Sequence, residues 1–218
     1  MDILVRLVSL LIGYVFGTFQ TAVLYGKLKG VDIRKMGSGN AGTTNTLRVL
    51  GTKAGFIVLF GDMFKCIIAV VLVSVIFGKS HPDMVYLLKI YAALGCVLGH
   101  DFPVMLKFKG GKGIACTAGY MCAMHPSFIP MFVILFLIVF NITHYVSLGS
   151  LAIYVGFVVQ LIIEGQMGMY HMSQAHLIEM YIIAVFMTVL AFYQHRTNIV
   201  KLVNNNERKT YIFKKNTL

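Results

Sequence analysis

The segment 37–45 reads GSGNAGTTN and combines three glycines with hydroxyl and amide side chains. Glycine lets backbone N–H groups close around an anion, and the hydroxyl and amide groups between the glycines supply further donors. If a helix begins at this loop, Arg48 stands one turn beyond it. The loop lacks the Gly-Lys-Ser/Thr ending of a P-loop, and no strand precedes it as in a dinucleotide-binding fold. We therefore expect a phosphate-binding loop; the alternative is a flexible connection.

A second polar segment, 107–113, reads KFKGGKG and stands at the entrance of an apolar run. Backbone N–H groups at a helix N-terminus, with the Lys112 ammonium beside them, match the needs of a phosphate group. The alternative is a basic anchor at a membrane surface. That alternative explains Lys107 and Lys109 but not the glycines around Lys112, so we expect a second phosphate-binding loop.

A third polar segment, 195–202, reads HRTNIVKL and follows the last apolar run. His195 and Asn198 are three residues apart and therefore share one face of a helix. A histidine there can donate a hydrogen bond or transfer a proton near neutral pH. Its alternative role is to fill the membrane interface. We expect His195 and Asn198 to face one site together with the other two segments.

Two further pairs of polar residues are spaced three apart. Ser147 and Ser150 stand at the start of an apolar run, where Ser147 can either cap a helix or contact a substrate. Asp62 and Lys65 lie inside another apolar run. Because a charge in lipid costs at least about 2.5 kcal/mol, we expect these two to pair inside the protein, as architecture rather than as catalysts.

Other reactive residue types do not form recognisable sites. His100 and Asp101 are adjacent and point to different faces of a helix, so we expect a structural role rather than a catalytic dyad. The four cysteines lie in apolar runs without metal-ligand spacing. We therefore expect neither a metal site nor a cofactor.

The elements that carry these segments are apolar. The chain is 58% hydrophobic and 12% charged, whereas a soluble domain carries about 25% charged residues. The net charge of +11 comes from residues in the connections, and no soluble basic domain remains. Membrane lipid and anionic substrates are therefore the expected partners, and nucleic acid is not. We predict an all-α integral membrane protein.

A helix that crosses a bilayer needs about 20 residues, with a range of about 17 to 25. The apolar run 113–124 is shorter and ends at His125-Pro126, so we expect it to form a helical pair with the next run, joined by a tight turn. The result is a seven-helix bundle in one polytopic domain, 1–203, followed by a polar basic cytoplasmic tail, 204–218. The predicted helices cover 3–25, 54–77, 84–105, 113–124, 127–142, 147–164 and 174–193.

Basic residues set the expected orientation. They gather in the connections on one side, within 27–53, 107–112 and 196–215, and Lys79 is the only one in a connection on the other side. Short connections rich in lysine and arginine stay in the cytoplasm. We therefore expect the N-terminus outside, the C-terminus in the cytoplasm, and all three polar segments at the cytoplasmic face.

These segments resemble the bacterial membrane glycerol-3-phosphate acyltransferase family that takes its acyl group from acyl phosphate. The likeness covers nearly the whole chain and rests on GSGNAGTTN at 37–45, GHDFPVMLKFKGGKG at 99–113, YVSLGS at 145–150 and HRTNI…KL…E at 195–207. The chain departs from the family pattern at Thr43, Cys116, His144, Lys201 and Asn205. None of these departures touches the expected site residues.

The resemblance implies transfer of a fatty acyl group from acyl phosphate to the 1-hydroxyl of sn-glycerol 3-phosphate, giving lysophosphatidate and phosphate. This is the first acylation of phospholipid synthesis, at the cytoplasmic face of the bacterial inner membrane. The enzyme that supplies acyl phosphate is a further candidate partner. The alternative is a transporter of a small phosphorylated solute, which predicts broken or charged helices at the midplane and a second polar face outside.

The candidate catalytic residues are His195, Asn198 and Ser38. The candidate substrate- or phosphate-binding residues are Gly37, Ser38, Gly39, Asn40, Thr44, Asn45, Arg48, Lys107, Gly110, Gly111, Lys112, Gly113, Ser147 and Ser150. The catalytic base is either His195 or the departing phosphate. A covalent acyl-enzyme on Ser38 is less attractive, because no histidine or carboxylate stands beside it in sequence.

Overall fold

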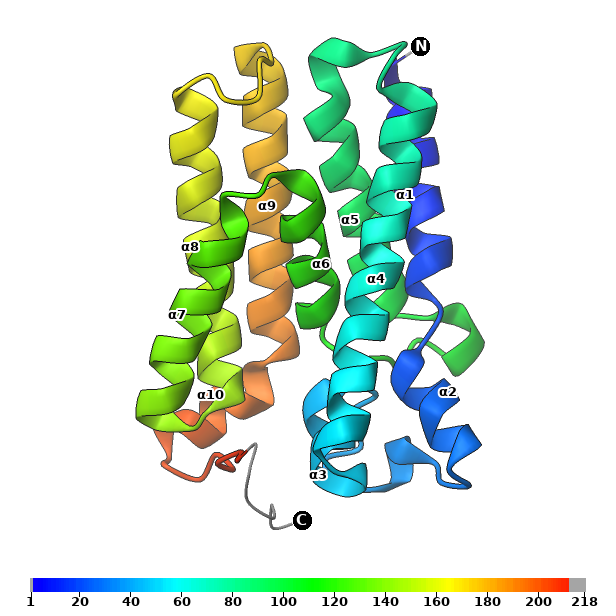
Figure 1. Cartoon of the computed structure of the whole chain (residues 1–218), viewed down its shortest axis with the longest axis vertical. Coiled ribbons are helices and arrows are strands. Elements are labelled where there is room, and N and C mark those ends of the chain that lie inside the picture. The colour runs from blue at the N-terminus through cyan, green and yellow to red at the C-terminus, as the bar shows by residue number, and fades with distance from the viewer. Residues whose placement is uncertain (1, 212–218) are drawn as a thin grey trace.

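The computed structural model describes residues 2–211, and every regular element among them is helical. The long helices run side by side as a bundle (Figure 1). The α-helices are α1 Asp2–Gly17, α2 Thr21–Leu28, α3 Thr43–Leu50, α4 Thr52–Phe77, α5 Val85–Asp101, α6 Ile114–Met124, α7 Phe128–Thr143, α8 Val146–Gln166, α9 Gln174–Gln194 and α10 Arg196–Val203. Three short 3-10 helices connect them: η1 Ile33–Lys35, η2 Pro82–Met84 and η3 Val104–Leu106.

The all-α membrane class predicted from the sequence is confirmed. Five helical segments are long and apolar enough to cross a membrane, and α6 and α7 are shorter apolar helices. The helix count differs from seven, because the first expected span is divided into α1 and α2 and because α3 and α10 form in the polar segments. Seven crossings of the bilayer therefore stay a prediction.

The break between α1 and α2 is held by the buried pair that the sequence predicts inside α4. Lys65 Nζ lies 2.9 Å from Asp62 Oδ1 and donates hydrogen bonds to the carbonyl oxygens of Gly17 (3.2 Å) and Phe19 (2.6 Å). Thr21, the first residue of α2, donates from Oγ1 to Asp62 Oδ1. Carbonyls freed by a helix break in lipid need such donors, since water is absent there.

Helices α6 and α7 form the expected pair joined by a tight turn. Figure 1 shows this turn well below the end of the bundle at which α8 meets α9. Lys89 of α5 donates to the carbonyl oxygens of Ala123 (3.3 Å) and Met124 (3.5 Å) at the C-terminal end of α6. The lysine thus satisfies carbonyls that would otherwise be unpaired inside the bundle.

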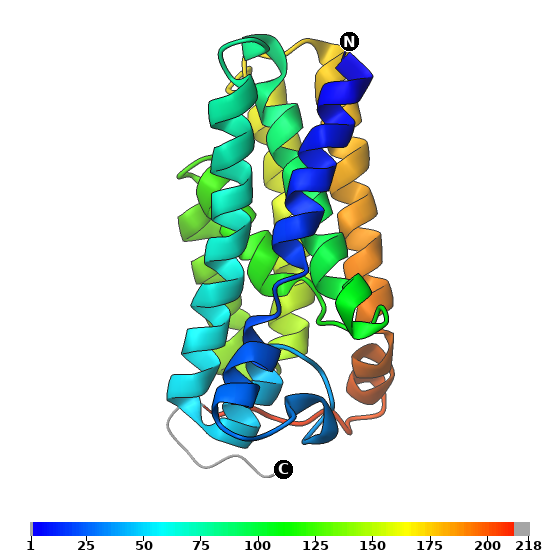
Figure 2. The same ribbon diagram turned by 90° about the vertical axis from the view of Figure 1, so that its right-hand side faces the viewer.

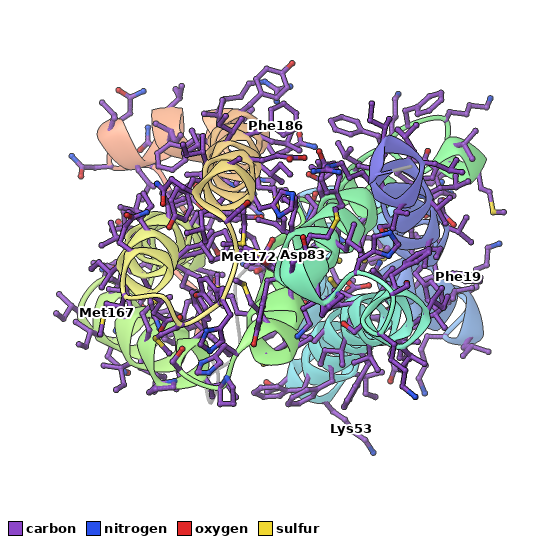
Figure 3. All side chains as sticks on the ribbon, turned by 90° about the horizontal axis from the view of Figure 1, so that it is seen from above. Phe19, Lys53, Asp83, Met167, Met172 and Phe186 are labelled. Carbon is purple, nitrogen blue, oxygen red and sulfur yellow. The ribbon has the colours of Figure 1, made fainter. Side chains whose placement is uncertain are left out.

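The backbones of α1 and α5 lie in close contact. A Cβ atom at Gly13 would lie 1.9 Å from the Ala92 carbonyl oxygen, and one at Gly95 would lie 2.0 Å from the Leu10 carbonyl oxygen. Small residues that let helix backbones touch are typical of membrane interiors. Large apolar side chains instead face outward: in Figure 3, seen along the bundle, Phe186 of α9 lies at the periphery, and it is 50% exposed. This apolar outer surface fits a protein surrounded by lipid.

The two ends of the bundle differ in character. The N-terminus lies at one end, whereas α2, α3 and α10 lie at the other (Figures 1 and 2). The described part of the chain finishes at this second end too. The polar segments of the sequence are therefore gathered where the short helices are, which defines the site end of the bundle.

Candidate functional site

The loop 37–42 is shaped by Asn45, in the first turn of α3. Its Oδ1 accepts a hydrogen bond from the Ser38 backbone N–H (2.8 Å), and its Nδ2 donates to the carbonyl oxygens of Ile33 and Met36, both at 3.0 Å. Gly37 has φ +60°, and a Cβ atom there would lie 2.3 Å from Asn45 Oδ1. Asn45 is 1% exposed, so its amide supports the loop, whereas the Ser38 side chain lies exposed on it.

A chain of hydrogen bonds at the site end links the loop 107–113, α10, the segment after α10 and the start of α8. Lys112 Nζ donates to Asn198 Oδ1 on α10, and Asn198 Nδ2 donates to Glu207 Oε1 (2.8 Å). Ser147, in the first turn of α8, donates from Oγ to the same Glu207 oxygen (3.1 Å). Ser147 does not cap α8, because Tyr145 occupies the N-cap position. The structure thus brings together three of the predicted site residues around a carboxylate.

Glu207 itself was not among the predicted site residues. It follows α10 in a polar stretch whose composition resembles an unstructured tail. One feature of the sequence indicates it: Glu207 is the last residue of the motif HRTNI…KL…E at 195–207. Glu207 accepts hydrogen bonds from both Ser147 and Asn198. It therefore orients the Asn198 side-chain amide, whose oxygen accepts the hydrogen bond from Lys112.

Arg48 also meets the segment that follows α10. Its Nη2 donates to the Arg208 carbonyl oxygen (2.9 Å) and to Thr210 Oγ1 (2.7 Å). Burial lowers the pKa of the Arg48 guanidinium, and the nearby Glu207 partly opposes that shift. Burial likewise lowers the pKa of the Lys112 ammonium, with Glu207 again opposing. Two desolvated cations around a single carboxylate favour the arrival of an anion.

His195 is 4% exposed at the junction of α9 and α10. Its Nδ1 lies 2.8 Å from the Ala191 carbonyl oxygen, which can only accept, so we place the ring proton on Nδ1 and the lone pair on Nε2. Burial, with the charge of Lys112 as a second cause, lowers the pKa of His195 to about 4. At neutral pH the ring is therefore uncharged and offers Nε2 as a hydrogen-bond acceptor.

The glycines of the loop 107–113 serve close packing against the end of α5. The N–H groups of Gly110 and Gly111 donate to the carbonyl oxygens of Asp101 (3.1 Å) and His100 (3.0 Å). These two N–H groups are therefore not available to an anion, contrary to the expected cradle. Gly113, with φ +73°, is the N-cap of α6 and leaves the first N–H groups of that helix beside Lys112.

Two candidate residues are not brought into this network. Ser150 is 2% exposed and donates from Oγ to the Val146 carbonyl oxygen within α8. Lys107 is exposed after η3, with φ 53°. No hydrogen bond joins Lys107 to Arg48, Lys112 or His195 within residues 2–211. Gly39, Asn40 and Thr44 lie with Ser38 in the loop and the first turn of α3.

Comparison with known proteins gives consistent matches. The sequence pattern of the family described as "Glycerol-3-phosphate acyltransferase" matches residues 7–205. A glycerol-3-phosphate acyltransferase of Clostridioides difficile (strain 630) is 37% identical over 96% of this chain and 97% of the relative. One of Bacillus subtilis (strain 168) is 34% identical over 93% of this chain and 97% of the relative.

Two solved structures have the same fold. The crystal structure of PlsY (YgiH), an integral membrane glycerol 3-phosphate acyltransferase, in its glycerol 3-phosphate form matches with a TM-score of 0.81 and 32% identity, covering 94% of this chain and 96% of that one. Its lysophosphatidic acid form matches with a TM-score of 0.79 and 31% identity, covering 96% and 97%. The likeness thus extends over nearly the full length of both proteins.

Proposed function

The chain belongs to the glycerol-3-phosphate acyltransferase family, and on this premise we propose that it transfers a fatty acyl group from acyl phosphate to the 1-hydroxyl of sn-glycerol 3-phosphate. The products are lysophosphatidate and inorganic phosphate. The observation that carries the proposal is the Lys112–Asn198–Glu207–Ser147 network beside Arg48. The similar crystal structures, one in a glycerol 3-phosphate form and one in a lysophosphatidic acid form, support the same substrate and product classes.

The cations of the site bind the phosphate groups. Lys112 and Arg48 both lie close to Glu207, so they serve one basin, and we assign to them the phosphate of glycerol 3-phosphate. Ser38 and its loop hold the phosphate of the acyl donor. Two anions repel each other in solution, and charge neutralisation with positioning is the main contribution that the protein makes to the rate.

The reaction needs one new bond and one broken bond. The glycerol hydroxyl oxygen attacks the acyl carbonyl carbon, the bond from that carbon to the phosphate oxygen breaks, and phosphate leaves with the bonding electrons. His195 Nε2 accepts the hydrogen bond of the attacking hydroxyl and aims it. Because its pKa is only about 4, His195 is a weak proton acceptor, so the departing phosphate takes the proton.

Ser38 acts as a ligand in this mechanism and not as a nucleophile. An acyl-enzyme needs a base within hydrogen-bond reach of the serine. In the described part of the chain, no histidine or carboxylate is hydrogen-bonded to the exposed Ser38 hydroxyl, and its backbone N–H donates to Asn45. Direct transfer between the two bound substrates follows.

We place the site at the cytoplasmic face of the bacterial inner membrane, with the N-terminus outside and the C-terminus inside. The basic connections of the sequence support this orientation, since they coincide with the site end of the bundle (Figure 2). Single cysteines at exposed positions test it: Ser38→Cys at the site end and Met167→Cys at the other, each in a chain without the four native cysteines. A membrane-impermeant maleimide applied to intact cells should label only Cys at 167; labelling at 38 would reverse the orientation.

One assay tests the reaction. Purified protein in lipid nanodiscs receives labelled glycerol 3-phosphate with palmitoyl phosphate, palmitoyl-CoA or palmitoyl-acyl-carrier protein. We expect labelled lysophosphatidate with palmitoyl phosphate alone. Equal product from the thioesters would overturn the donor assignment. In a second experiment the protein is placed in sealed lipid vesicles, where uptake of glycerol 3-phosphate without acylation would instead support the transporter alternative.

A further inference from the structure

The segment 204–210, which we call the strap, runs back across the site end of the bundle after α10. Its side chains are largely exposed, with two exceptions: Glu207 is partly buried, and Thr210 is 1% exposed. Figures 1 and 2 show the strap passing from α10 towards α3. A threonine so fully buried in an otherwise polar, exposed segment needs a partner, because burying an unpaired hydroxyl is unfavourable.

Thr210 has two partners, and they belong to different parts of the bundle. Its backbone N–H donates to the carbonyl oxygen of His144, in the connection between α7 and α8 (2.9 Å). Its Oγ1 accepts from Nη2 of Arg48, in the last turn of α3 (2.7 Å). The strap therefore ties α3 to the α7–α8 connection through a single residue.

Two hydrogen bonds to the strap hold Nη2 of the Arg48 guanidinium in place. Nη2 carries two hydrogens, and the Arg208 carbonyl oxygen and Thr210 Oγ1 provide one acceptor for each. Nε is buried and has no acceptor among residues 2–211. Because the guanidinium is planar and rigid, holding Nη2 sets the direction of its remaining N–H groups.

The strap assembles the site and does not block it. Glu207, three residues before Thr210, accepts from Asn198 and Ser147 and so helps to place the acceptor of Lys112. Only Nη2 of Arg48 is occupied by the strap. A segment that competed with a phosphate would be expected to accept a hydrogen bond from Lys112 as well. The Lys112 ammonium instead donates to Asn198, on α10.

We propose that Thr210 is a positioning residue: its hydroxyl, with the Arg208 carbonyl, orients Arg48 so that the rest of the guanidinium binds the phosphate of glycerol 3-phosphate. This inference rests on the proposed function. Thr210 does not touch the substrate. It lowers the cost of ordering a long side chain when the phosphate arrives.

The test compares four substitutions, three in the strap and Arg48→Ala, in the full chain, in nanodiscs, with palmitoyl phosphate as donor. Thr210→Val keeps the shape and removes the acceptor, so KM for glycerol 3-phosphate should rise about tenfold, the loss expected for one hydrogen bond to a charged group. The kcat value and KM for palmitoyl phosphate should stay within about twofold of the wild type. Thr210→Ser keeps the hydroxyl and should restore the wild-type KM. Lys209→Ala, at the exposed neighbour in the strap, is the matched control and should change nothing.

Two results would overturn the proposal. One is a wild-type KM for glycerol 3-phosphate in Thr210→Val. The other is a fall of kcat, of kcat/KM for both substrates and of the thermal unfolding midpoint, all to a similar degree. That result would make Thr210 a purely structural residue. Arg48→Ala separates this inference from the proposed function: if it raises KM for glycerol 3-phosphate while Thr210→Val does not, only the positioning role fails. If no variant and no wild-type protein makes lysophosphatidate, the proposed function fails.

Discussion

Lys65 donates a hydrogen bond to Nδ1 of His100, with 2.8 Å between the two nitrogens. An ammonium group can only donate, so Nδ1 accepts and the ring proton stands on Nε2. That nitrogen faces the glycine loop, since a Cβ atom built at Gly111 would lie 2.1 Å from it. The buried pair in α4 is thus connected, through one imidazole, to the loop that carries Lys112.

The buried cation should matter for stability. Lys65→Met leaves the Asp62 carboxylate, 1% exposed, without its cation and removes one donor from each of the Gly17 and Phe19 carbonyl oxygens. Breaking a buried pair in this way costs about 3 to 5 kcal/mol. We expect a clear fall in the thermal unfolding midpoint in detergent. The double variant Asp62→Asn, Lys65→Met should recover part of it; a double variant no more stable than the single one would show that the charge on Asp62 is not the cause.

Gly111→Ala should impair binding of glycerol 3-phosphate. The new methyl group would clash with His100 and push the loop away from α5, so that Lys112 moves from Asn198. KM for glycerol 3-phosphate should rise by more than tenfold in steady-state assays. Gly168→Ala is the control: that glycine has φ +79° and nothing within 4 Å of a Cβ atom. It should cost only the backbone strain of about 1 to 2 kcal/mol, with an unchanged KM.

The two lysines of the second loop should differ. Lys112→Ala removes a desolvated cation hydrogen-bonded into the network, and KM for glycerol 3-phosphate should rise about 10- to 100-fold. Lys107→Ala removes an exposed cation after η3 and should change that KM less than about twofold. Substrate titrations of both variants at one ionic strength provide the measurement. Equal effects would mean that the loop acts only through its total charge.

Stability should depend on pH through His195. Its pKa is about 4 in the folded protein and 6.5 ordinarily, so the unfolded chain binds more protons between these values. Stability is then highest above about pH 6.5 and is lost as the pH falls towards 4. The thermal midpoint of the wild type should drop across this window more than that of His195→Gln. His171→Gln, at an exposed histidine, should behave as the wild type. Parallel curves for all three proteins would contradict the low pKa.

Most of the architecture followed from local properties of the sequence. Hydrophobic runs predicted every long helix, and the short run 113–124 with its His125-Pro126 turn correctly predicted the α6–α7 pair. The Asp62–Lys65 pair was also correct, because two charges three residues apart in lipid have few alternatives to each other. Such features depend on residues that are close together in the sequence, so one sequence is enough to predict them.

What the sequence did not predict depends on partners distant in the chain. The first predicted span, 3–25, is divided near Gly17, and the carbonyl oxygens of Gly17 and Phe19 find their donor in Lys65 of α4, which is distant in sequence. Thr210 belongs to a polar stretch, and its burial accompanies hydrogen bonds to Arg48 and to the His144 carbonyl oxygen, both distant in sequence. Ser150 had the spacing of a site residue, yet its hydroxyl bonds back into its own helix. Composition gives no sign of such pairings.

The short α6–α7 hairpin has a consequence for the surrounding bilayer. Its turn stops well below one end of the bundle, so the two halves of the protein differ in cross-section (Figure 1). The bundle is therefore wider at the end that holds α2, α3 and α10 than at the other. We expect it to take a larger lateral area in the leaflet at that end, the same leaflet into which a newly acylated, single-chain product would be released.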